Sequence, residues 1–301
     1  MSTLDVAPRP VPSPARAVLP STLRRRNRRT RLRRAGLMAA RAAVAAVFCF
    51  PLYWMWVTAT GPKGSAYRLP PRLLPGFDYH SFLTVIDGTD WARYMLNSTF
   101  ITGSTIVLVL VTAALAGWAL VALPLKLRGV VFIVLLGTML LPEQALIIPQ
   151  YVVNLHLHML NTYEVMIVPF AANSSSIFLF RQYFASMPTE WRDAARVEGL
   201  GNLRYLWRVA LPAAKPVVFT VVLLTFIASW NMFQWPLVMT QNPSIAPIEL
   251  ALNQYQQGYA ASQRLINAVS LLALLPIVAV FAVAQRRIIS AIAGVDSGVE
   301  E

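Results

Sequence analysis

The chain has 301 residues, of which 56% are hydrophobic and only 13% are charged, and its mean hydropathy is +0.54. This balance excludes an ordinary soluble domain and is typical of a protein that lies in a lipid bilayer. The single Cys49 excludes a disulfide framework within the chain, and the net charge of +13 is concentrated near the N-terminus rather than spread over a soluble surface.

The first 35 residues are basic and rich in proline and serine. They show no apolar period, so we expect residues 1–35 to form a disordered tail on the cytoplasmic side of a membrane. This stretch contains no aromatic side chains on which bases could stack, and we therefore expect no nucleic-acid partner. The arginines of the tail are Arg9, Arg16, Arg24, Arg25, Arg26, Arg28, Arg29, Arg31, Arg33 and Arg34.

Six apolar segments follow, and each reaches the length of about 20 residues that a helix needs to cross a bilayer core. We expect membrane-spanning helices over residues 36–60, 97–123, 129–155, 163–184, 212–239 and 265–284. The predicted fold class is therefore all-α, a polytopic membrane protein with six transmembrane helices in a domain over residues 36–290. Residues 291–301 are predicted to be a cytoplasmic tail.

Small residues recur at close spacing in the second apolar segment. They are Ala113, Ala114, Ala116, Gly117 and Ala119. Small side chains let two membrane helices approach closely, so we interpret this run as a packing surface.

Lysine and arginine are distributed unequally between the two sides of the predicted helices. Because positive side chains are retained in the cytoplasm, we expect the protein to lie in a plasma or inner membrane with both termini on its cytoplasmic side. In this orientation the cytoplasmic side carries the arginines of the N-terminal tail and also Lys126, Arg128, Arg181, Arg192, Arg196, Arg204, Arg208, Lys215, Arg286 and Arg287. Those outside are Lys63, Arg68, Arg72, Arg93 and Arg264.

The loop over residues 188–212 is too polar to cross a membrane. Thr189 can cap a helix whose first turn holds Glu190, where the helix dipole favours an acid. Gly199 then ends this helix, and a second helix is expected from about Asn202. The apolar face of the second helix would consist of Leu203, Leu206, Trp207, Ala210 and Leu211. Periodicity alone would also allow an ordinary helix at the membrane surface, or a solvated loop.

The spacing in this loop is more specific than its periodicity. The cytoplasmic motif of importer permeases, E-A-A-x3-G-x9-I-x-L-P, is matched with both gaps intact by Asp193-Ala194-Ala195, Gly199, Val209, Leu211 and Pro212. Asp193 replaces glutamate and Val209 replaces isoleucine, so charge and apolar character are kept. The chain thus resembles the permease subunits of ATP-binding-cassette importers.

The resemblance covers roughly residues 36–298 and is nearest to the carbohydrate and glycerol-3-phosphate uptake subfamily, including the maltose-type second permease. It is carried by Pro51-Leu52-Tyr53, Asn97-Ser98, Leu141-Pro142, Ile148-Pro149, Trp230-Asn231 and Trp235-Pro236.

This resemblance implies that the polar loop is a coupling helix, which docks on a cytoplasmic ATP-binding subunit. The residues implied in ATPase coupling are Glu190, Asp193, Ala194, Ala195, Glu198, Gly199, Val209, Leu211 and Pro212. The implied partners are two copies of the ATP-binding subunit, a second homologous permease and an extracytoplasmic solute-binding protein. The chain itself would bind no cofactor, because ATP is hydrolysed by the partner, and the solute would be sugar-like.

Polar side chains at membrane depth are candidates for solute contact, because an unpaired buried amide is costly. Asn231 and Gln234, with the neighbouring Trp235, combine amides with an aromatic face that suits a sugar. The alternative is that Asn231 joins two helices and the tryptophans form an interfacial belt.

Other functional classes lack their characteristic residues. The chain has no phosphate-binding loop, so we expect it not to be an ATPase or another enzyme. A proton-coupled secondary transporter or channel, the main alternative, would require ionisable residues within the spans. A membrane enzyme would require a cluster of His, Asp or Glu. His80, His156 and His158 have no carboxylate cluster nearby in sequence, and no metal site is expected.

Overall fold

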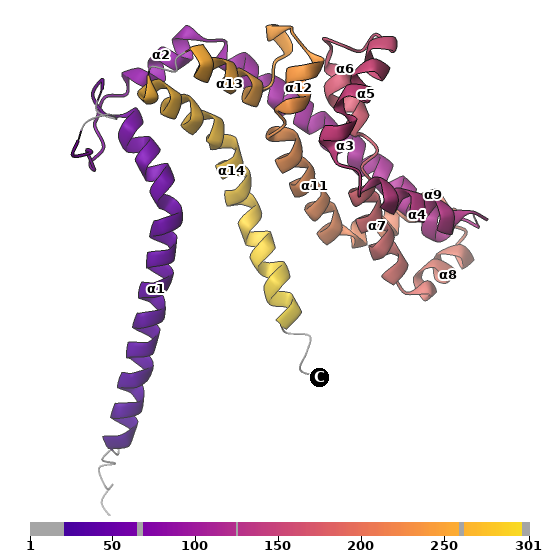
Figure 1. Ribbon diagram of the computed structural model, residues 1–301. Coiled ribbons are helices and arrows are strands. Elements are labelled where there is room, and N and C mark those ends of the chain that lie inside the picture. The colour runs from indigo at the N-terminus through magenta and orange to yellow at the C-terminus, as the bar shows by residue number, and fades with distance from the viewer. Residues whose placement is uncertain (1–20, 65–68, 125, 259–261, 297–301) are drawn as a thin grey trace, which may run out of the picture. The chain divides into compact units, whose positions relative to one another are not determined.

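The computed structural model describes residues 21–64, 69–124, 126–258 and 262–296, with side chains over residues 34–64, 69–124, 126–258 and 262–285. Within these ranges the chain forms helices and no strands (Figure 1). It divides into two compact units, Met1–Trp54 and Met55–Glu301. The helices are α1 (Ser21–Ala59), α2 (His80–Gly88), α3 (Trp91–Ala122), α4 (Arg128–Thr138), α5 (Glu143–His156), α6 (Tyr163–Ile167), η2 (Val168–Phe170), α7 (Ser174–Ser186), α8 (Thr189–Val197), α9 (Asn202–Tyr205), η3 (Leu206–Ala210), α10 (Leu211–Ala213), α11 (Lys215–Trp230), α12 (Gln234–Met239), η4 (Pro243–Ile245), α13 (Ile248–Gly258) and α14 (Gln263–Asp296).

The first unit contains α1 as far as Trp54. Because α1 begins at Ser21, the prediction of a disordered tail is wrong from that residue on, while residues 1–20 lie outside the described ranges. Arginine is a good helix former, so the helix extends back beyond the apolar run. Val47 and Phe48 are 71% and 78% exposed, as expected for side chains that face lipid. At the other end of the chain, α14 reaches Asp296, so the predicted C-terminal tail is helical up to that residue.

Four helical stretches are long and apolar enough to cross a membrane, namely Arg34–Ala59, Trp91–Ala122, Tyr163–Ser186 and Gln263–Gln285. The third predicted span is instead a bent pair, because α4 meets α5 at 104°. A second bent pair joins α11, the main helix of the fifth predicted span, at 80° to the helix over Asn202–Ala213, most of which belongs to the predicted polar loop. The total is six only if each bent pair is one span. Pro142 lies directly before α5 and Pro216 lies in the first turn of α11, where the missing N–H groups favour a break.

Helix α3 is central to the second unit and packs against α7 and α11. The closest approach is at Gly117, where a Cβ atom would lie 2.8 Å from Phe180 Cβ and 2.9 Å from the Arg181 backbone nitrogen. Ala113 and Ala114 on the same helix are fully buried. The predicted close approach through small residues is therefore confirmed.

Arg264 holds together one end of the second unit, where α2, α13 and the start of α14 lie. Its guanidinium forms an ion pair of 2.8 Å with the Asp78 carboxylate and donates from Nε to the Ala59 carbonyl at 3.3 Å. The His80 backbone N–H donates to the Asp78 carboxylate, and this hydrogen bond lowers the pKa of the Asp78 carboxyl. Burial raises that pKa and Arg264 lowers it, so the net direction is downward. Arg264 thereby ties the end of α1 to α2 and α14.

We expect Arg264→Leu to lower the stability of the second unit, because the buried Ala59 carbonyl would lose a charged donor. Hydrogen bonds to charged groups contribute about 1.5–3 kcal/mol each, and the expected loss is about 2 kcal/mol. The measurement is thermal unfolding of the purified chain in detergent. Arg93→Leu is the matched control, because Arg93 is exposed and donates only to the Ser244 carbonyl at 2.9 Å. Equal melting temperatures for the two variants would contradict this role.

Candidate coupling segment and solute pathway

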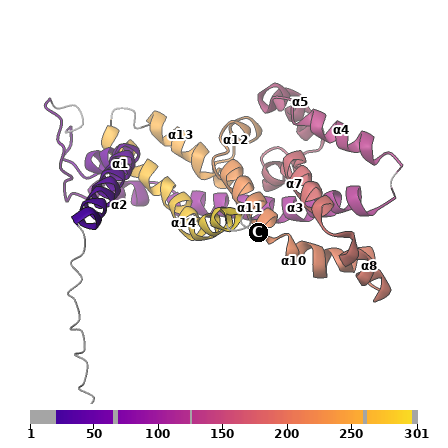
Figure 2. The same cartoon turned by 90° about the horizontal axis from the view of Figure 1, so that it is seen from below.

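Helix α8 lies beyond the end of α7, at the end of the second unit away from α2 and α13 (Figures 1 and 2). Pro188 occupies its N-cap position and makes no side-chain capping bond. Thr189 is the first helical residue, so the prediction that Thr189 caps the helix is wrong. Glu190 lies in the first turn, as predicted.

The turn after α8 depends on Gly199, whose φ of 77° lies in the left-handed region that favours glycine. The Gly199 N–H donates to the Arg196 carbonyl at 3.0 Å, and the Leu200 N–H donates to the Ala195 carbonyl at 2.9 Å. These bonds satisfy the last carbonyls of α8 and direct the chain into α9. The predicted bend between two short helices is therefore confirmed.

The predicted coupling residues of α8 divide into a buried side and an exposed side. Ala195 is 7% exposed and packs toward the core, whereas Glu190, Asp193, Ala194 and Glu198 are exposed. Asp193 forms an exposed ion pair of 3.6 Å with Arg196, and such surface pairs contribute little to stability. The outer surface of α8 therefore carries three acids and the exposed Arg196, and it is free for contact with another molecule.

The second half of the segment buries a different face from the predicted one. Leu206 and Ala210 are buried as expected, but Leu203 is 59% exposed and Trp207 is 44% exposed. Tyr205, which the predicted apolar face omitted, is buried instead. The helix is thus rotated so that the Tyr205 ring rather than the Trp207 ring reaches the core.

The predicted residues Val209, Leu211 and Pro212 complete the segment next to α11. Val209 and Leu211 are half-buried against the core, and Pro212 is exposed. The turn over η3 is a π-helix, and Pro212 supplies the reason, because it lacks the N–H that would otherwise bond to the Arg208 carbonyl. The Tyr183 hydroxyl donates to the Ala213 carbonyl at 2.6 Å and holds α10 on α7.

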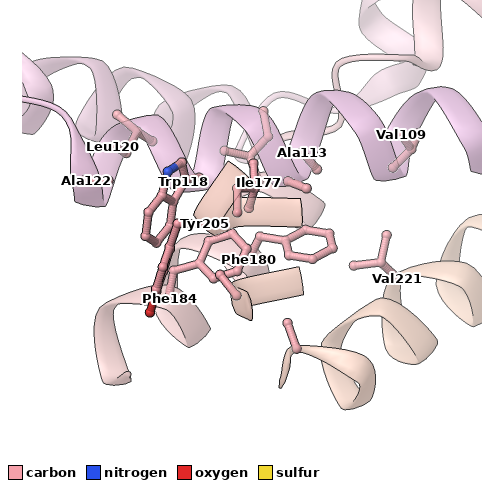
Figure 3. Packing of buried hydrophobic residues seen from close by; sticks show 14 of the residues in the cluster. Val109, Ala113, Trp118, Leu120, Ala122, Ile177, Phe180, Phe184, Tyr205 and Val221 are labelled. Carbon is pink, nitrogen blue, oxygen red and sulfur yellow. The ribbon is translucent and has the colours of Figure 1, made fainter. Parts of the chain in front are cut away.

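An aromatic cluster connects this segment to the long helices. The Tyr205 ring stacks on Trp118 of α3 with centroids 5.2 Å apart, and Phe184 of α7 meets Trp118 edge-on at 5.5 Å (Figure 3). Trp118 therefore joins α9 to both long helices, since its ring contacts Tyr205 on α9 and Phe184 on α7. The sequence reasoning missed Trp118 and Tyr205, because aromatic residues near the end of a span are equally typical of an interfacial belt.

The predicted solute residues flank the break between α11 and α12. Asn231 is exposed, and its amide donates to the Ile227 carbonyl at 2.8 Å; Gln234 is also exposed at the start of α12. Trp235 is buried, donates from its indole to the Val165 carbonyl at 2.8 Å and meets Phe170 edge-on. Trp235 thus fixes α12 on α6, and only the two amides are accessible for a solute.

A comparison with known protein families matches more than half of the chain. Residues 109–293 match the family described as binding-protein-dependent transport system inner membrane component. The chain belongs to this family. The matched region begins within α3 and includes the candidate coupling segment, which runs from α8 to α10, and the break before α12. The predicted recognition as an ATP-binding-cassette importer permease is therefore confirmed.

Relatives of this permease extend the similarity over most of its length. It is 25% identical over 250 residues to the arabinooligosaccharides transport system permease protein AraQ of Bacillus subtilis, covering 81% of this chain and 88% of the relative. It is 30% identical over 246 residues to the sn-glycerol-3-phosphate transport system permease protein UgpE of Yersinia enterocolitica, covering 79% and 88%. The corresponding Escherichia coli O157:H7 protein is also 30% identical, over 250 residues, covering 80% and 89%.

A solved structure supports the fold of this permease. A chain from a bacterial ABC transporter involved in the import of the acidic polysaccharide alginate superimposes with a TM-score of 0.75 and 21% identity, covering 86% of this chain and 97% of that chain. The all-α membrane fold class is therefore confirmed. The coupling role of α8, the contacts of Asn231 and Gln234 and the cytoplasmic location of the termini stay predictions.

Proposed function

We propose that this permease pairs with a second homologous permease to form the pathway for a sugar, or for a related polyol or glycerol phosphate. Two cytoplasmic ATP-binding subunits hydrolyse ATP, and an extracytoplasmic binding protein delivers the solute. The chain itself performs no catalysis and binds no cofactor. Both its termini lie in the cytoplasm, which places α8 on the side of the ATP-binding subunits.

The solute class is supported by the relatives and by the chemistry of the α11–α12 break. One relative is named for arabinooligosaccharides and two for sn-glycerol-3-phosphate, which are hydroxyl-rich solutes. Exposed amides such as those of Asn231 and Gln234 both donate to and accept from hydroxyl groups. A neutral, hydrogen-bonding pathway therefore fits this class better than a relay of protons.

The coupling mechanism is carried by one observation, the helix–turn–helix over α8 and α9 with a charged outer surface and an aromatic attachment to α3 and α7. Exposed apolar side chains adjoin the acids, including Trp191 at 49% and Val197 at 91%. Apolar and aromatic groups surrounded by charge are typical of protein interfaces. Closure of the ATP-binding subunits would push α8, and the Tyr205–Trp118 contact would pass the shift to the spans in alternating access.

The direct test is purification of the chain from its native membrane with its partners, followed by an ATPase assay in liposomes. We expect an ATP-binding subunit and a second permease to copurify, and ATP hydrolysis to rise when a solute-loaded binding protein is added. Solute uptake by the chain alone, driven by a proton gradient, would instead support the secondary-transporter alternative.

We expect Asn231→Ala and Gln234→Ala each to raise the KM for solute roughly 3- to 10-fold, because a net hydrogen bond is worth about 0.5–1.5 kcal/mol. The maximal rate of ATP hydrolysis should change little, since neither side chain contacts α8. The measurement is uptake by the reconstituted complex at increasing solute concentration. Gln254→Ala is the matched control, an exposed amide on α13 away from the break. An unchanged KM in both pathway variants would remove these residues from the pathway.

A further inference from the structure

A cavity of about 300 Å³ opens between α3, α4 and α7, at the same end of the second unit as α8. Its lining combines two guanidinium groups, Arg128 and Arg181, with the apolar side chains of Leu120, Val121 and Phe132. The predicted coupling and solute residues all lie outside this lining. The cavity is therefore separate from both functions proposed above.

The two arginines of the cavity carry charge that no acid neutralises. Neither Arg128 nor Arg181 forms an ion pair with a carboxylate in the described part of the chain. The Arg181 guanidinium lies 4.5 Å from the centre of the Phe132 ring, which holds it in place by a cation–π contact. One of its N–H groups donates to Gln182 at 3.0 Å, and the remaining donors stay available.

The first turn of α4 adds a third source of positive potential. Arg128 and Gly129 are the first two helical residues, and the N-cap residue Leu127 provides no side-chain acceptor for the free N–H groups. A Cβ at Gly129 would meet no atom within 4 Å, so there is open space beside this backbone. Free N–H groups at a helix start favour an anion, and here they lie beside two arginines.

An apolar surface continues from the cavity along α4. Val131 and Leu135 lie three and seven residues after Arg128, on the same side of α4, and Val131 is 46% exposed while Leu135 is half-buried. A free anion would leave this surface uncovered, whereas acyl chains attached to the anion would lie along it. Basic pockets between membrane helices at the cytoplasmic side bind anionic lipid headgroups for the same electrostatic reason.

We propose that this cavity binds the phosphate of an anionic phospholipid, with Arg128 and Arg181 as the phosphate ligands and the side of α4 that carries Val131 and Leu135 as the acyl-chain contact. The phosphate oxygens accept from the two guanidinium groups, and Phe132 fixes the orientation of one of them. A lipid held there fills the space between α4 and α7 next to the coupling segment. The inference depends on the membrane location that the family shows, and not on which solute is carried.

The test is native mass spectrometry of the purified full chain after equilibration with equal amounts of phosphatidylglycerol and phosphatidylcholine. We expect the wild type to retain phosphatidylglycerol preferentially and the Arg128→Gln/Arg181→Gln variant to bind it roughly thirtyfold more weakly, since each basic residue adds about 1 kcal/mol to such binding. The matched control is Arg204→Gln/Lys215→Gln, which removes the same charge from exposed positions outside the cavity. It should retain the lipid as the wild type does.

A second variant guards against misfolding of the double substitution. Gly129→Glu places a carboxylate in the open space of the cavity without a steric clash, and it should lose the lipid to the same extent. Retention of phosphatidylglycerol by Gly129→Glu, or an equal loss in the Arg204→Gln/Lys215→Gln control, would overturn the proposal. Displacement of the lipid by an equal concentration of free glycerol phosphate would assign the site to a soluble phosphate instead.

Discussion

Substituting Val197 by lysine is expected to abolish copurification with the ATP-binding subunit and solute-stimulated ATP hydrolysis. Val197 ends α8, is 91% exposed and lies beside the acid Glu198. In the docked state this apolar side chain would be buried against the partner, so a lysine there brings a charge that must lose its hydration. Charge mismatches in a buried interface cost about 2–5 kcal/mol, and about 3 kcal/mol corresponds to roughly a hundredfold loss of affinity.

The fold of the Val197→Lys chain should remain intact. The exposed side chain makes no core contact to lose, and lysine has a higher helix propensity than valine. Val197→Thr is the matched control, because it keeps the shape and adds no charge, and we expect it to retain the ATP-binding subunit. Thermal unfolding of both variants at the wild-type temperature separates coupling from stability. A Val197→Lys chain that still copurifies with a fully stimulated ATPase would contradict docking through α8.

The fold class and the coupling turn could be predicted from the sequence because both depend on local properties. Apolar runs of sufficient length imply membrane helices whatever surrounds them. The bend after α8 likewise depends on Gly199 alone, whose positive φ is disfavoured for other residues. The spacing from Asp193 to Pro212 indicates the family, because a motif spacing does not depend on how the helices pack.

The errors came from features that depend on packing partners. Periodicity placed Leu203 and Trp207 on the buried face, yet the helix buries Tyr205 because the Trp118 ring is positioned to stack on it. Trp235 was similarly predicted to contact solute, but its indole N–H donates to the Val165 carbonyl and the ring is buried. The 104° bend between α4 and α5 also depends on how each half-helix packs, and hydropathy averages over it.

In the proposed mechanism, the aromatic attachment gives the segment over α8–α10 a mechanical role that sequence motifs alone do not indicate. The motif residues Ala195 and Gly199 shape the docking end, while Trp118 and Phe184 hold the segment on the spans. The docking surface can therefore be altered without disturbing the core, and the core can be altered without changing the docking surface. Val197 probes the first of these two parts, and Gly117 probes the second.

Substituting Gly117 by leucine is expected to prevent stable folding of the second unit. A Cβ at this position would lie 2.8 Å from Phe180 Cβ and 2.9 Å from the Arg181 backbone nitrogen, so α3 and α7 would have to separate. Overpacking of this kind costs about 1–3 kcal/mol even where the neighbours can shift, and here one obstacle is backbone. Separation of α3 from α7 would also break the stacking around Trp118. The measurement is the fraction of monodisperse protein in detergent and its melting temperature.

Gly103→Leu is the matched control on the same helix. Gly103 is exposed, and a Cβ there meets no atom within 4 Å, so the same substitution carries only the gain in helix propensity of about 1 kcal/mol over glycine. We expect this variant to fold and to melt at or above the wild-type temperature. If both leucine variants fold equally well, the close contact at Gly117 does not hold α3 to α7, and the transmission of movement from α8 to the spans must use other contacts. Loss of folding in the Gly117 variant alone would place the α3–α7 contact at the centre of the permease core.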